Sequence, residues 1–599
     1  MNRLHWQSLA LALSILVFGL AVFARLATSP SPQPTPPPQA AQEAQPATEQ
    51  AYVTPTPLLP SPEPVPVLPS QDTHQVQEDS VVTYTEALIG SLSRLNPLYA
   101  DLNPVDRDIS SLIFDGLFQI NAYGEAVPDL AESWIMGSEG LEYVVTLRED
   151  VLWQDGLPFT AEDVFFTVSL MQDSSLGSTA EMSQFWRTVE AQVVTPQIIR
   201  FRLTQPLASF LHRLTFGVLP EHALRGTSAA EMASHRFNIT PIGTGAYQLE
   251  SLQSSDGETI DIVNLRVAPN YRLRTDGAEG YAIERLRFRL YPSYEAAYAA
   301  FQRGQVDGLA ARNWDERLPL LELPNTNTYT SLAPALGVLL YNWSEPEGVR
   351  FFQELRVRLA LMIGLNRQTP VETHLNNRVV VADSPILANS WAYDPTLQYP
   401  VTNPLAALDL LRTANIQTPK SPQPAEGEPT LTPDPIIYRF SLLVEDNPPL
   451  VAIAREIAAQ WSQYGLEVTV EAVPAPVLTQ RLEDGDFMAA IAQLTLASDP
   501  DGYAYWHVGQ APDGKNYGAL ADDRLSELLE RARRDANGIN RVQLYQQFQR
   551  RFIDRAVAIP LYTPLFTYVV SNKVNNVQLG IITDPTDRFR TLRDWIISS

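Results

Sequence analysis

Hydrophobic positions in the last third of the chain follow two different periods. Residues 436–444 are mostly apolar, as in a buried strand, and in residues 450–464 apolar side chains recur every three or four positions up to Trp461, as on one helix face. After Gly465, apolar and polar residues alternate over 466–470, as on a half-buried strand. This order predicts a β-α-β unit with parallel strands and a right-handed crossover.

Shorter patterns predict further elements of both kinds. Thr160 to Asp163 is a capping-box pattern that predicts a helix start, and Ser293 can cap a helix that closes at Gly304. Other patterns predict strands over 141–147, 198–203 and 488–494, and a helix over 524–534 capped by Asp522 or Asp523. Residues 418–435 read as a Pro-rich surface insertion. From about Val81 onward, the chain therefore has the pattern of an α/β protein.

The first 80 residues have another pattern. Residues 9–24 are almost all apolar, but they reach only about 24 Å as a helix, less than the ~30 Å hydrocarbon core of a membrane. Residues 29–70 are about one-third proline and cannot form a packed core. We predict a signal peptide or membrane anchor over 1–28 and a disordered Pro-rich tether over 29–80. The short apolar run favours a cleaved signal, whereas a tether favours an anchor. Either way the body is exported.

Composition narrows the function classes. The 599 residues carry a formal net charge of −25, so a basic face for nucleic acid is not expected. The absence of cysteine excludes disulfides, thiolate metal sites and cysteine catalysis. The many tryptophans and tyrosines suit a ligand-binding cleft, because aromatic rings give large contact area for little lost rotamer entropy.

Motifs for catalysis are missing. There is no His-x-x-x-His pair and no Gly-x-Ser-x-Gly elbow. Gly243 to Gly245 lacks the third glycine of a dinucleotide loop and predicts a tight turn in which glycine supplies a positive φ. Residues 509–516 have phosphate-loop spacing, but Asn516 replaces the hydroxyl residue that would hold Mg²⁺, so a plain loop is expected. We therefore predict no catalytic residue, no bound metal and no cofactor.

An ordered set of motifs resembles one protein family, the family 5 extracellular solute-binding proteins of ABC importers, which include the oligopeptide- and dipeptide-binding proteins. The motifs are LNPLY at 95–99, IFDGLF at 113–118, VPDLAESW at 127–134, WQDG at 153–156, FTAEDV at 159–164, PIGTGAY at 241–247, GQVDG at 304–308, RVRLA at 356–360 and DPD at 499–501. Each motif is weak, but together they cover the chain from about Val81 to its end.

The resemblance implies a fold and a domain order. The fold would be α/β, a two-lobed periplasmic-binding-protein-like (type II, Venus-flytrap) fold with an inserted third domain. Lobe I would comprise residues 81–118, 211–290 and 560–599, the inserted domain 119–210 and lobe II 291–559. The chain would cross between the lobes near residues 290 and 560, where a few residues can absorb a closing rotation.

Within this scheme the matched motifs are mostly scaffold. We expect Trp134, Trp153 and Phe165 to be core aromatics, and Arg356 and Arg358 to pair with surface acids. The candidate ligand-binding residues lie in loops rich in aromatic and polar side chains: Tyr341, Asn342, Trp343, Trp391, Tyr393, Asp499, Asp501, Tyr503, Trp506, His507, Asn516 and Tyr517.

One position departs from the family. In its peptide binders, an Asp three residues before the acidic residue–Pro pair grips the amino terminus of the peptide. In this sequence Leu496 occupies that position, and a leucine cannot neutralise a buried ammonium. Asp499 or Asp501 could substitute for the missing acid. A peptide is therefore a plausible cargo, and sugars, metal chelates and other small polar solutes remain open.

The resemblance implies a function and partners. The protein would be a monomeric substrate-binding subunit that captures an oligopeptide or dipeptide by lobe closure and delivers it to ABC permease subunits in the membrane. It would act at the outer face of the cytoplasmic membrane if anchored, or in the periplasm or outside the cell if cleaved. Two alternatives stay open. One is a sensing module coupled to a membrane receptor, and the other is an extracellular peptidase whose catalytic residues are not adjacent in sequence.

Overall fold

The structure, a computed structural model, describes residues 81–137, 140–273, 280–344, 351–414, 438–511, 514–535 and 537–598. Several predictions fall outside these residues, namely the signal or anchor over 1–28, the tether over 29–80 and the Pro-rich insertion over 418–435. Two residues of the phosphate-loop-like segment, Pro512 and Asp513, also lie outside them.

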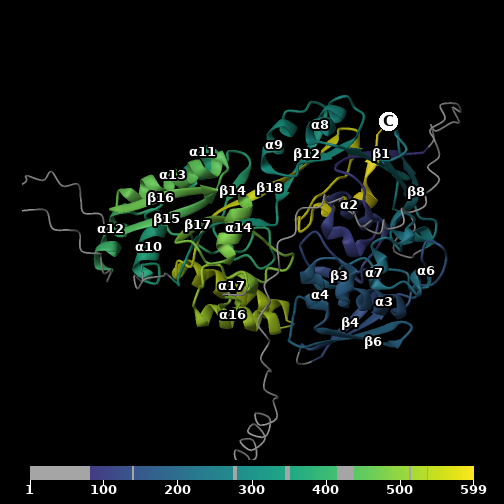
Figure 1. Cartoon of the computed structure of the whole chain (residues 1–599), viewed down its shortest axis with the longest axis horizontal. Coiled ribbons are helices and arrows are strands. Elements are labelled where there is room, and N and C mark those ends of the chain that lie inside the picture. The colour runs from purple at the N-terminus through teal and green to yellow at the C-terminus, as the bar shows by residue number, and fades with distance from the viewer. Residues whose placement is uncertain are drawn as a thin grey trace, which may run out of the picture. The chain divides into compact units, whose positions relative to one another are not determined.

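Twelve of the described strands form one mixed sheet (Figure 1). Its order is β16 (Leu466–Val473), β15 (Tyr438–Glu445), β17 (Ala489–Thr495), β13 (Ala335–Tyr341), β18 (Ile559–Ser571), β11 (Gly308–Ala310), β1 (Thr83–Ile89), β10 (Arg285–Tyr291), β9 (Ile262–Val267) and β8 (Tyr247–Gln253). Beside this path, β12 (Thr326–Leu332) and β14 (Val379–Val381) also pair with β18.

The 13-residue strand β18 joins the two halves of this sheet. Its start pairs with β13, where Tyr562 lies opposite Gly337, and its end pairs with β12 and β11. Side chains of β18 also enter both large hydrophobic clusters: Tyr562 packs in the cluster of the β13–β16 half, and Tyr568 in the cluster of the β1–β10 half. A short link at residues 333–334, between β12 and β13, is a second connection between the halves.

The predicted β-α-β unit is confirmed. β15 and β16 are parallel along their whole length, and α13 (Pro448–Ser462) connects them. Trp461, on the buried face of α13, donates its indole N–H to the carbonyl of Leu361 at 3.1 Å. Gly465 has φ +80° where the chain leaves the helix, a conformation that glycine adopts without strain.

The shorter patterns are confirmed as well. Thr160 and Asp163 form a capping box, and Asp522, rather than Asp523, accepts from the Leu525 N–H at the start of its helix. The elements concerned are α3 (Ala161–Gln172), α8 (Tyr294–Gln302), α16 (Asp523–Arg534), β5 (Glu142–Leu147), β7 (Ile198–Leu203) and β17.

A smaller antiparallel sheet lies within residues 119–210. Its order is β4 (Ala131–Met136), β5, β7 and β6 (Val189–Thr195). Helix α3 packs on β6 and β7, and α4 (Ala180–Trp186) packs against α3. The other helices are α2 (Pro104–Ile113), α5 (Phe210–Arg213), α6 (Glu221–Leu224), α7 (Ala229–Met232), α9 (Trp314–Leu321), α10 (Leu355–Ile363), α11 (Gln368–His374), α12 (Pro404–Thr413), α14 (Ala475–Glu483), α15 (Tyr503–Trp506) and α17 (Gly538–Asp554). Short strand pairs are β2 (Phe118–Ile120) with β3 (Ala126–Pro128), and β19 (Val574–Asn575) with β20 (Ile596–Ile597).

The expected burial of the motif aromatics holds for only one of three. Trp153 is fully buried, but Trp134 is 36% exposed and Phe165 is 42% exposed. Trp134 lies on the edge strand β4, and Phe165 lies on the outer face of α3, whose inner face is formed by Val164 and Val168. The prediction for Trp134 and Phe165 is therefore wrong, because the local pattern does not say which face the neighbouring sheet covers.

The two arginines of α10 differ. Arg356 pairs with Glu354 at 3.2 Å near the surface, as predicted. Arg358, in contrast, is fully buried, and its guanidinium lies 3.7 Å from the centroid of the Trp343 ring. Burial lowers the pKa of Arg358 to about 10. The predicted surface acid for Arg358 is wrong, because the guanidinium instead donates to backbone carbonyls, including that of Arg555.

Gly243 and Gly245 let their loop lie close to the end of α2, and they are not needed for a positive φ in a turn. Neither has a positive φ, so the predicted conformation is wrong. The Gly245 N–H donates to the carbonyl of Ile113 at 2.8 Å, and a Cβ added at Gly243 would lie 1.8 Å from that oxygen. Only a residue without a Cβ lets this loop lie against the end of α2.

A buried charge network holds the C-terminal segment in place. Arg588 donates to Glu86 of β1 at 3.0 Å and to Asp108 of α2 at 2.6 Å. Glu86 also accepts from the hydroxyls of Tyr84 and Tyr568, at 2.7 and 2.8 Å. Residues nearly 500 positions apart are therefore bonded in one core.

The domain boundaries inferred from the resemblance stay predictions. The structure adds one observation about the boundary near 290. Helix α8 and strand β11, placed in lobe II by that scheme, pack with Ala87 of β1 and Val569 of β18 in a small hydrophobic cluster. The segment after residue 290 thus contacts the β1 half of the sheet before the chain reaches β13.

Replacing Gly243 by Ala should lower the free energy of unfolding by about 1–3 kcal/mol or more, because the new methyl overlaps the Ile113 carbonyl. The matched control is Gly538→Ala at the first residue of α17, where a Cβ meets nothing within 4 Å. That variant should change stability by less than about 1 kcal/mol. Urea unfolding of both variants measures the difference, and equal stabilities would contradict the close-approach argument.

Candidate functional site

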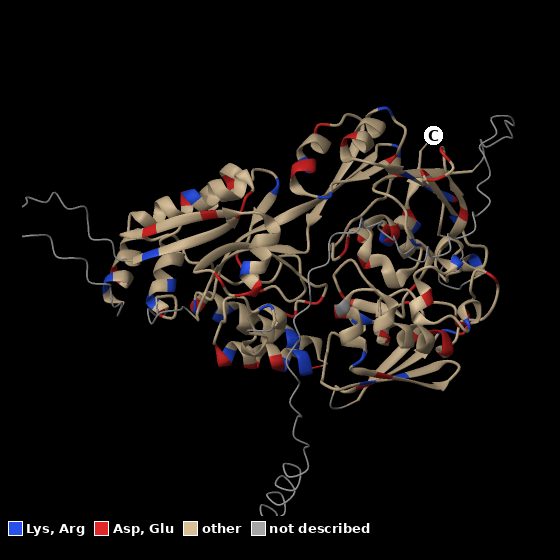
Figure 2. Cartoon of the chain, viewed as in Figure 1, with Lys and Arg blue, Asp and Glu red and all other residues tan. Residues whose placement is uncertain are grey.

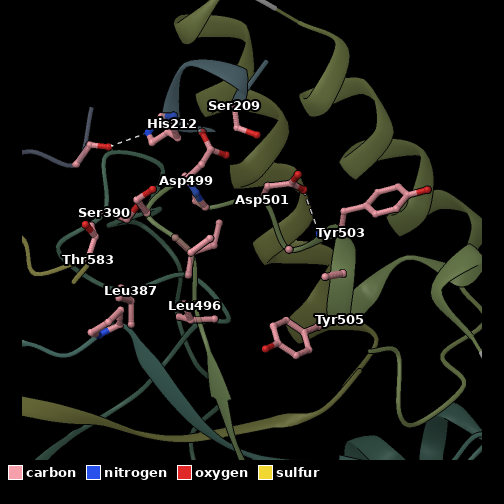
Figure 3. Close-up of a pocket in the computed structure, with 18 of the residues that line it drawn as sticks. Ser209, His212, Leu387, Ser390, Leu496, Asp499, Asp501, Tyr503, Tyr505 and Thr583 are labelled. Carbon is pink, nitrogen blue, oxygen red and sulfur yellow. Dashed lines mark hydrogen bonds and ion pairs between the residues drawn. The ribbon is translucent and has the colours of Figure 1, made fainter. Parts of the chain in front are cut away.

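A cavity of about 690 Å³ is lined by segments from distant parts of the chain. They are residues 123–124, 205–213, 385–391, 495–506 and 581–583, with Glu181, Pro334, Lys515, Arg533 and Phe548 among the single residues. The segment 495–506 follows β17 and carries the DPD motif, so the end of one central strand places several cavity residues together. Figure 3 shows residues of these segments facing one another.

Asp499 is an acid that already has a partner. It is 4% exposed, and the Nη2 of Arg541 in α17 donates to both of its carboxylate oxygens, at 2.7 and 2.9 Å. Burial opposes the charge of Arg541, but Asp499 and Tyr545 outweigh it and raise the pKa of that guanidinium. The Arg541 guanidinium also lies 5.1 Å from the ring centroid of Trp391 at the cavity wall.

Asp501 also lies beside an arginine, as an ion pair. Its carboxylate lies 2.8 Å from Nε of Arg533 at the end of α16. Burial raises the pKa of Asp501, while Arg533 works against this rise. The side chain of Tyr503 points away from the other labelled residues in Figure 3 and lies between Arg533 and His507, with centroid distances of 4.1 and 4.0 Å. Both acids thus bind cations of the chain itself.

Segment 205–213 approaches these acids from the other side of the cavity. Nδ1 of His212 in α5 lies 3.8 Å from a carboxylate oxygen of Asp499, and its Nε2 lies 3.2 Å from the carbonyl of Gly124. The Ala208 N–H donates to the carbonyl of Arg533 at 2.6 Å. These contacts join the segment before α5 to the loops around α16.

The opposite end of the cavity is apolar. Leu387, Leu496 and Tyr505 lie together in the lower part of Figure 3, away from His212 and Asp499. The Leu496 N–H donates to the Pro334 carbonyl at 2.8 Å, which holds its side chain at the cavity wall. Burial raises the pKa of Tyr505 to about 12, and its hydroxyl donates to the backbone. The cavity therefore has one polar, charge-compensated end and one apolar end.

The structure brings some of the predicted ligand residues to this cavity. Its lining includes Trp391, Asp499, Asp501, Tyr503 and Trp506. The predicted residues outside it are Tyr341, Asn342, Trp343, Tyr393, His507, Asn516 and Tyr517. None of these twelve assignments to ligand binding is tested, so all stay predictions.

Most predicted residues outside the cavity have structural contacts. Tyr341, Trp343, Asn516 and Tyr517 surround a space of only about 10 Å³. The side-chain amide of Asn342 donates to two loop carbonyls, both at 2.9 Å, and that of Asn516 donates to the carbonyls of His507 and Leu520. Nε2 of His507 lies 3.0 Å from Glu530.

Sequence reasoning missed the residues of the opposite wall, namely Tyr123, Glu181, Ser209, His212, Arg213, Leu387, Ser390 and Thr583. None belongs to a motif with a chemical spacing. The one available signal was the polar residues of 209–213 beside the predicted boundary between the inserted domain and lobe I, which do not say where that segment packs.

Other kinds of site are not indicated by the described part of the chain. Within it, no three His, Asp or Glu side chains are grouped to hold a metal ion, and no helix has the length and apolarity needed to span a membrane. Acidic and basic residues are interspersed along the described elements (Figure 2).

A family model for bacterial extracellular solute-binding proteins, family 5, matches residues 125–515. The chain belongs to this family. The membership inferred from the ordered motifs is therefore confirmed, and the family is one of solute-binding proteins of ABC importers.

Relatives and solved structures agree with the family. The dipeptide-binding protein of Escherichia coli K12 is 23% identical over 495 residues, covering 77% of this chain and 84% of the relative. The oligopeptide-binding protein AppA of Bacillus subtilis is 25% identical over 489 residues, covering 80% and 85%. The structure of B. subtilis AppA with a nonapeptide matches with a TM-score of 0.59 at 21% identity, covering 86% and 99%. The predicted two-lobed type II fold is thereby confirmed.

The Asp499–Arg541 pair should be a large contributor to stability. Arg541→Met leaves Asp499 buried without its cation, and such a loss costs about 3–5 kcal/mol. Arg524→Met is the matched control, because Arg524 and its partner Glu527 are each about half exposed, and a surface pair contributes at most about 1 kcal/mol. Chemical denaturation of both variants checks this prediction, and a small effect of Arg541→Met would show that Asp499 finds another partner.

Proposed function

We propose that this protein is the substrate-binding subunit of an ABC importer that captures an extracellular peptide in the 690 Å³ cavity and delivers it to a membrane permease. The observation that carries the proposal is the joint lining of one cavity by segment 205–213 and segment 495–506. The volume lies within the ~300–1,000 Å³ of small-molecule sites, which suits a short peptide. The protein would act as an exported monomer, anchored at the outer face of the membrane or free outside it.

Closure would occur at the connections between the halves of the sheet. The link at residues 333–334 and the middle of β18 are the places where few residues join the two hydrophobic clusters. A solute that contacts both walls binds the closed form better and so shifts the population toward it. In this scheme the first crossing between the lobes lies at residues 333–334 instead of near residue 290, whereas the inserted domain keeps the boundaries inferred from the sequence.

The positions 496, 499 and 501 of the cavity do not favour a peptide that is held by its amino terminus. Leu496 is apolar, and both nearby acids are compensated by Arg541 and Arg533. A peptide ammonium would therefore find no uncompensated carboxylate on either Asp499 or Asp501. Apolar side chains of the peptide would contact Leu387, Leu496 and Tyr505, and its backbone would hydrogen-bond at the polar end.

The first test is direct. Mass spectrometry of the molecules released from the natively purified protein should find short peptides, and calorimetry should then measure their binding. Trp391→Ala should weaken that binding by roughly 1–4 kcal/mol if the ring is a buried anchor. Trp134→Ala is the control, because Trp134 is exposed on β4 and does not line the cavity. Equal affinities of the two variants, or release of only non-peptide solutes, would count against the peptide proposal.

A second test concerns Leu496, which replaces the acid that binds the amino terminus of a peptide. The natural protein should bind a tripeptide and its N-acetylated form with equal affinity. Leu496→Asp should create a preference for the free amine of at least tenfold, as for a hydrogen bond to a charged group worth about 1.5–3 kcal/mol. Leu496→Asn, which has the same shape without the charge, should not. A strong preference already present in the natural protein would mean that another acid recognises the amine.

A further inference from the structure

A second cavity, of about 420 Å³, shares no lining residue with the first. Its wall is formed by residues 311–315 at the start of α9, by residues 445–450 between β15 and α13, and by residues 564–566 of β18. Ala333 and Ala335 line this cavity, whereas Pro334 between them lines the first. The Ala335 N–H donates to the Ala333 carbonyl at 2.7 Å, so residues 333–335 form a tight turn, and the two cavities border the same connection.

This second cavity, which we call the hinge cavity, contains two polar atoms without partners. The side chain of Tyr562 is buried, and its hydroxyl makes no hydrogen bond. The side-chain oxygen of Asn447 is also buried without a hydrogen bond. Leaving such a group unsatisfied is unfavourable, because the lost hydrogen bonds to water are not replaced. A ligand that reaches both atoms after a small shift of the side chains that cover them would satisfy them.

Local structure explains why these atoms are free. Asn447 precedes α13, but Pro449 has no N–H at the second helical position, and the Asn447 side chain makes no capping bond. The Tyr562 ring lies flat against Gly337 of β13, where an added Cβ would come within 2.3 Å of it. Its ring centroid is 5.7 Å from that of Trp314. The backbone thus fixes both side chains where the cavity is.

The charges of the hinge cavity favour a cation. Arg312 is held by Glu316 at 2.5 Å, and Asp315 lies 3.4 Å from Arg378. Glu445, in contrast, has no ion pair with any residue in the part of the chain that the structure describes. Burial raises the pKa of Tyr562, and the nearby Glu445 carboxylate raises it further. The cavity therefore offers an uncompensated carboxylate beside two acceptor oxygens.

The remaining wall is apolar and aromatic. Leu450, Leu478, Leu565 and Phe566 line it, together with the Trp314 ring. Such a wall suits a hydrocarbon or aromatic body, and an ammonium near an aromatic face gains further attraction. We propose that the hinge cavity binds a small organic ammonium ion with an aromatic or alkyl body, and that its occupancy strengthens solute binding in the first cavity.

The conformation of the protein explains why a ligand in the hinge cavity should strengthen, and not weaken, solute binding in the first cavity. In this structure the walls of the first cavity are in contact, as the Ala208–Arg533 hydrogen bond shows, while the hinge cavity is open. A ligand in the hinge cavity contacts residues 311–315 on one side of the connection and residues 445–450 on the other. It stabilises the conformation that holds it, and the same conformation brings the walls of the first cavity together.

Calorimetry with three indoles of similar shape tests the site. Tryptamine, a cation, should bind the full chain with one-to-one stoichiometry, whereas 3-ethylindole and the anion indole-3-propionate should bind at least tenfold more weakly. Glu445→Gln should weaken tryptamine binding at least about tenfold, as expected for the loss of a charge-assisted hydrogen bond. Glu467→Gln is the control, because Glu467 pairs with Arg439 at the surface and does not line the cavity.

A second readout tests the coupling without knowledge of the solute. Because the chain has no cysteine, Gln192→Cys on β6 and Arg524→Cys on α16 would carry one pair of spin labels. Tryptamine should shift their distance distribution toward shorter values, and Glu445→Gln should abolish this shift. Absence of tryptamine binding, binding unaffected by Glu445→Gln, or binding without any change in distance would overturn the proposal, leaving the hinge cavity as a site for water only.

Discussion

The pairing of β18 with strands of both halves of the sheet is the constraint on which the rest of the structure depends. Its residues enter both large hydrophobic clusters, so neither half can form its full core without it. In the part of the chain that the structure describes, the short link at residues 333–334 also connects the two halves. A continuous strand resists stretching but can twist and bend, so it permits rotation of the halves while keeping them joined. Both cavities border this connection, since Pro334 lines the first and Ala333 and Ala335 line the second.

Buried arginines hold separate segments together in several parts of the molecule. Arg588 bonds the C-terminal segment to β1 and α2, and Arg541 bonds α17 to the loop after β17. Arg358 instead satisfies backbone carbonyls below Trp343. A buried charge without a partner is costly, so each of these residues fixes the position of the groups that surround it. At the first cavity, the same pairing removes the free negative charge of Asp499 and Asp501, and this shapes which solutes can bind there.

Much of the local structure could be predicted because its causes are local. The capping box at Thr160, the cap at Asp522 and the β-α-β unit around α13 each depend on residues within one or two turns or strands of one another. The ordered motifs were enough for the family, and four of the predicted ligand residues in the loop after β17, namely Asp499, Asp501, Tyr503 and Trp506, line one cavity. Whether these side chains contact a solute is a separate question, which depends on the opposite wall.

By itself, the sequence determined the fold class, the family and the elements whose signals lie within a short stretch of chain. Only the tertiary structure decided which faces are covered and which distant loops meet. Trp134 and Trp153 both belong to family motifs, yet Trp134 is exposed because it lies on an edge strand, and Trp153 is enclosed. His212 has no motif and lies beside Asp499 only because α5 packs against the loops near α16. Burial and proximity of remote residues depend on the packing of whole elements, and hydrophobic periodicity carries no information about which element will be the neighbour.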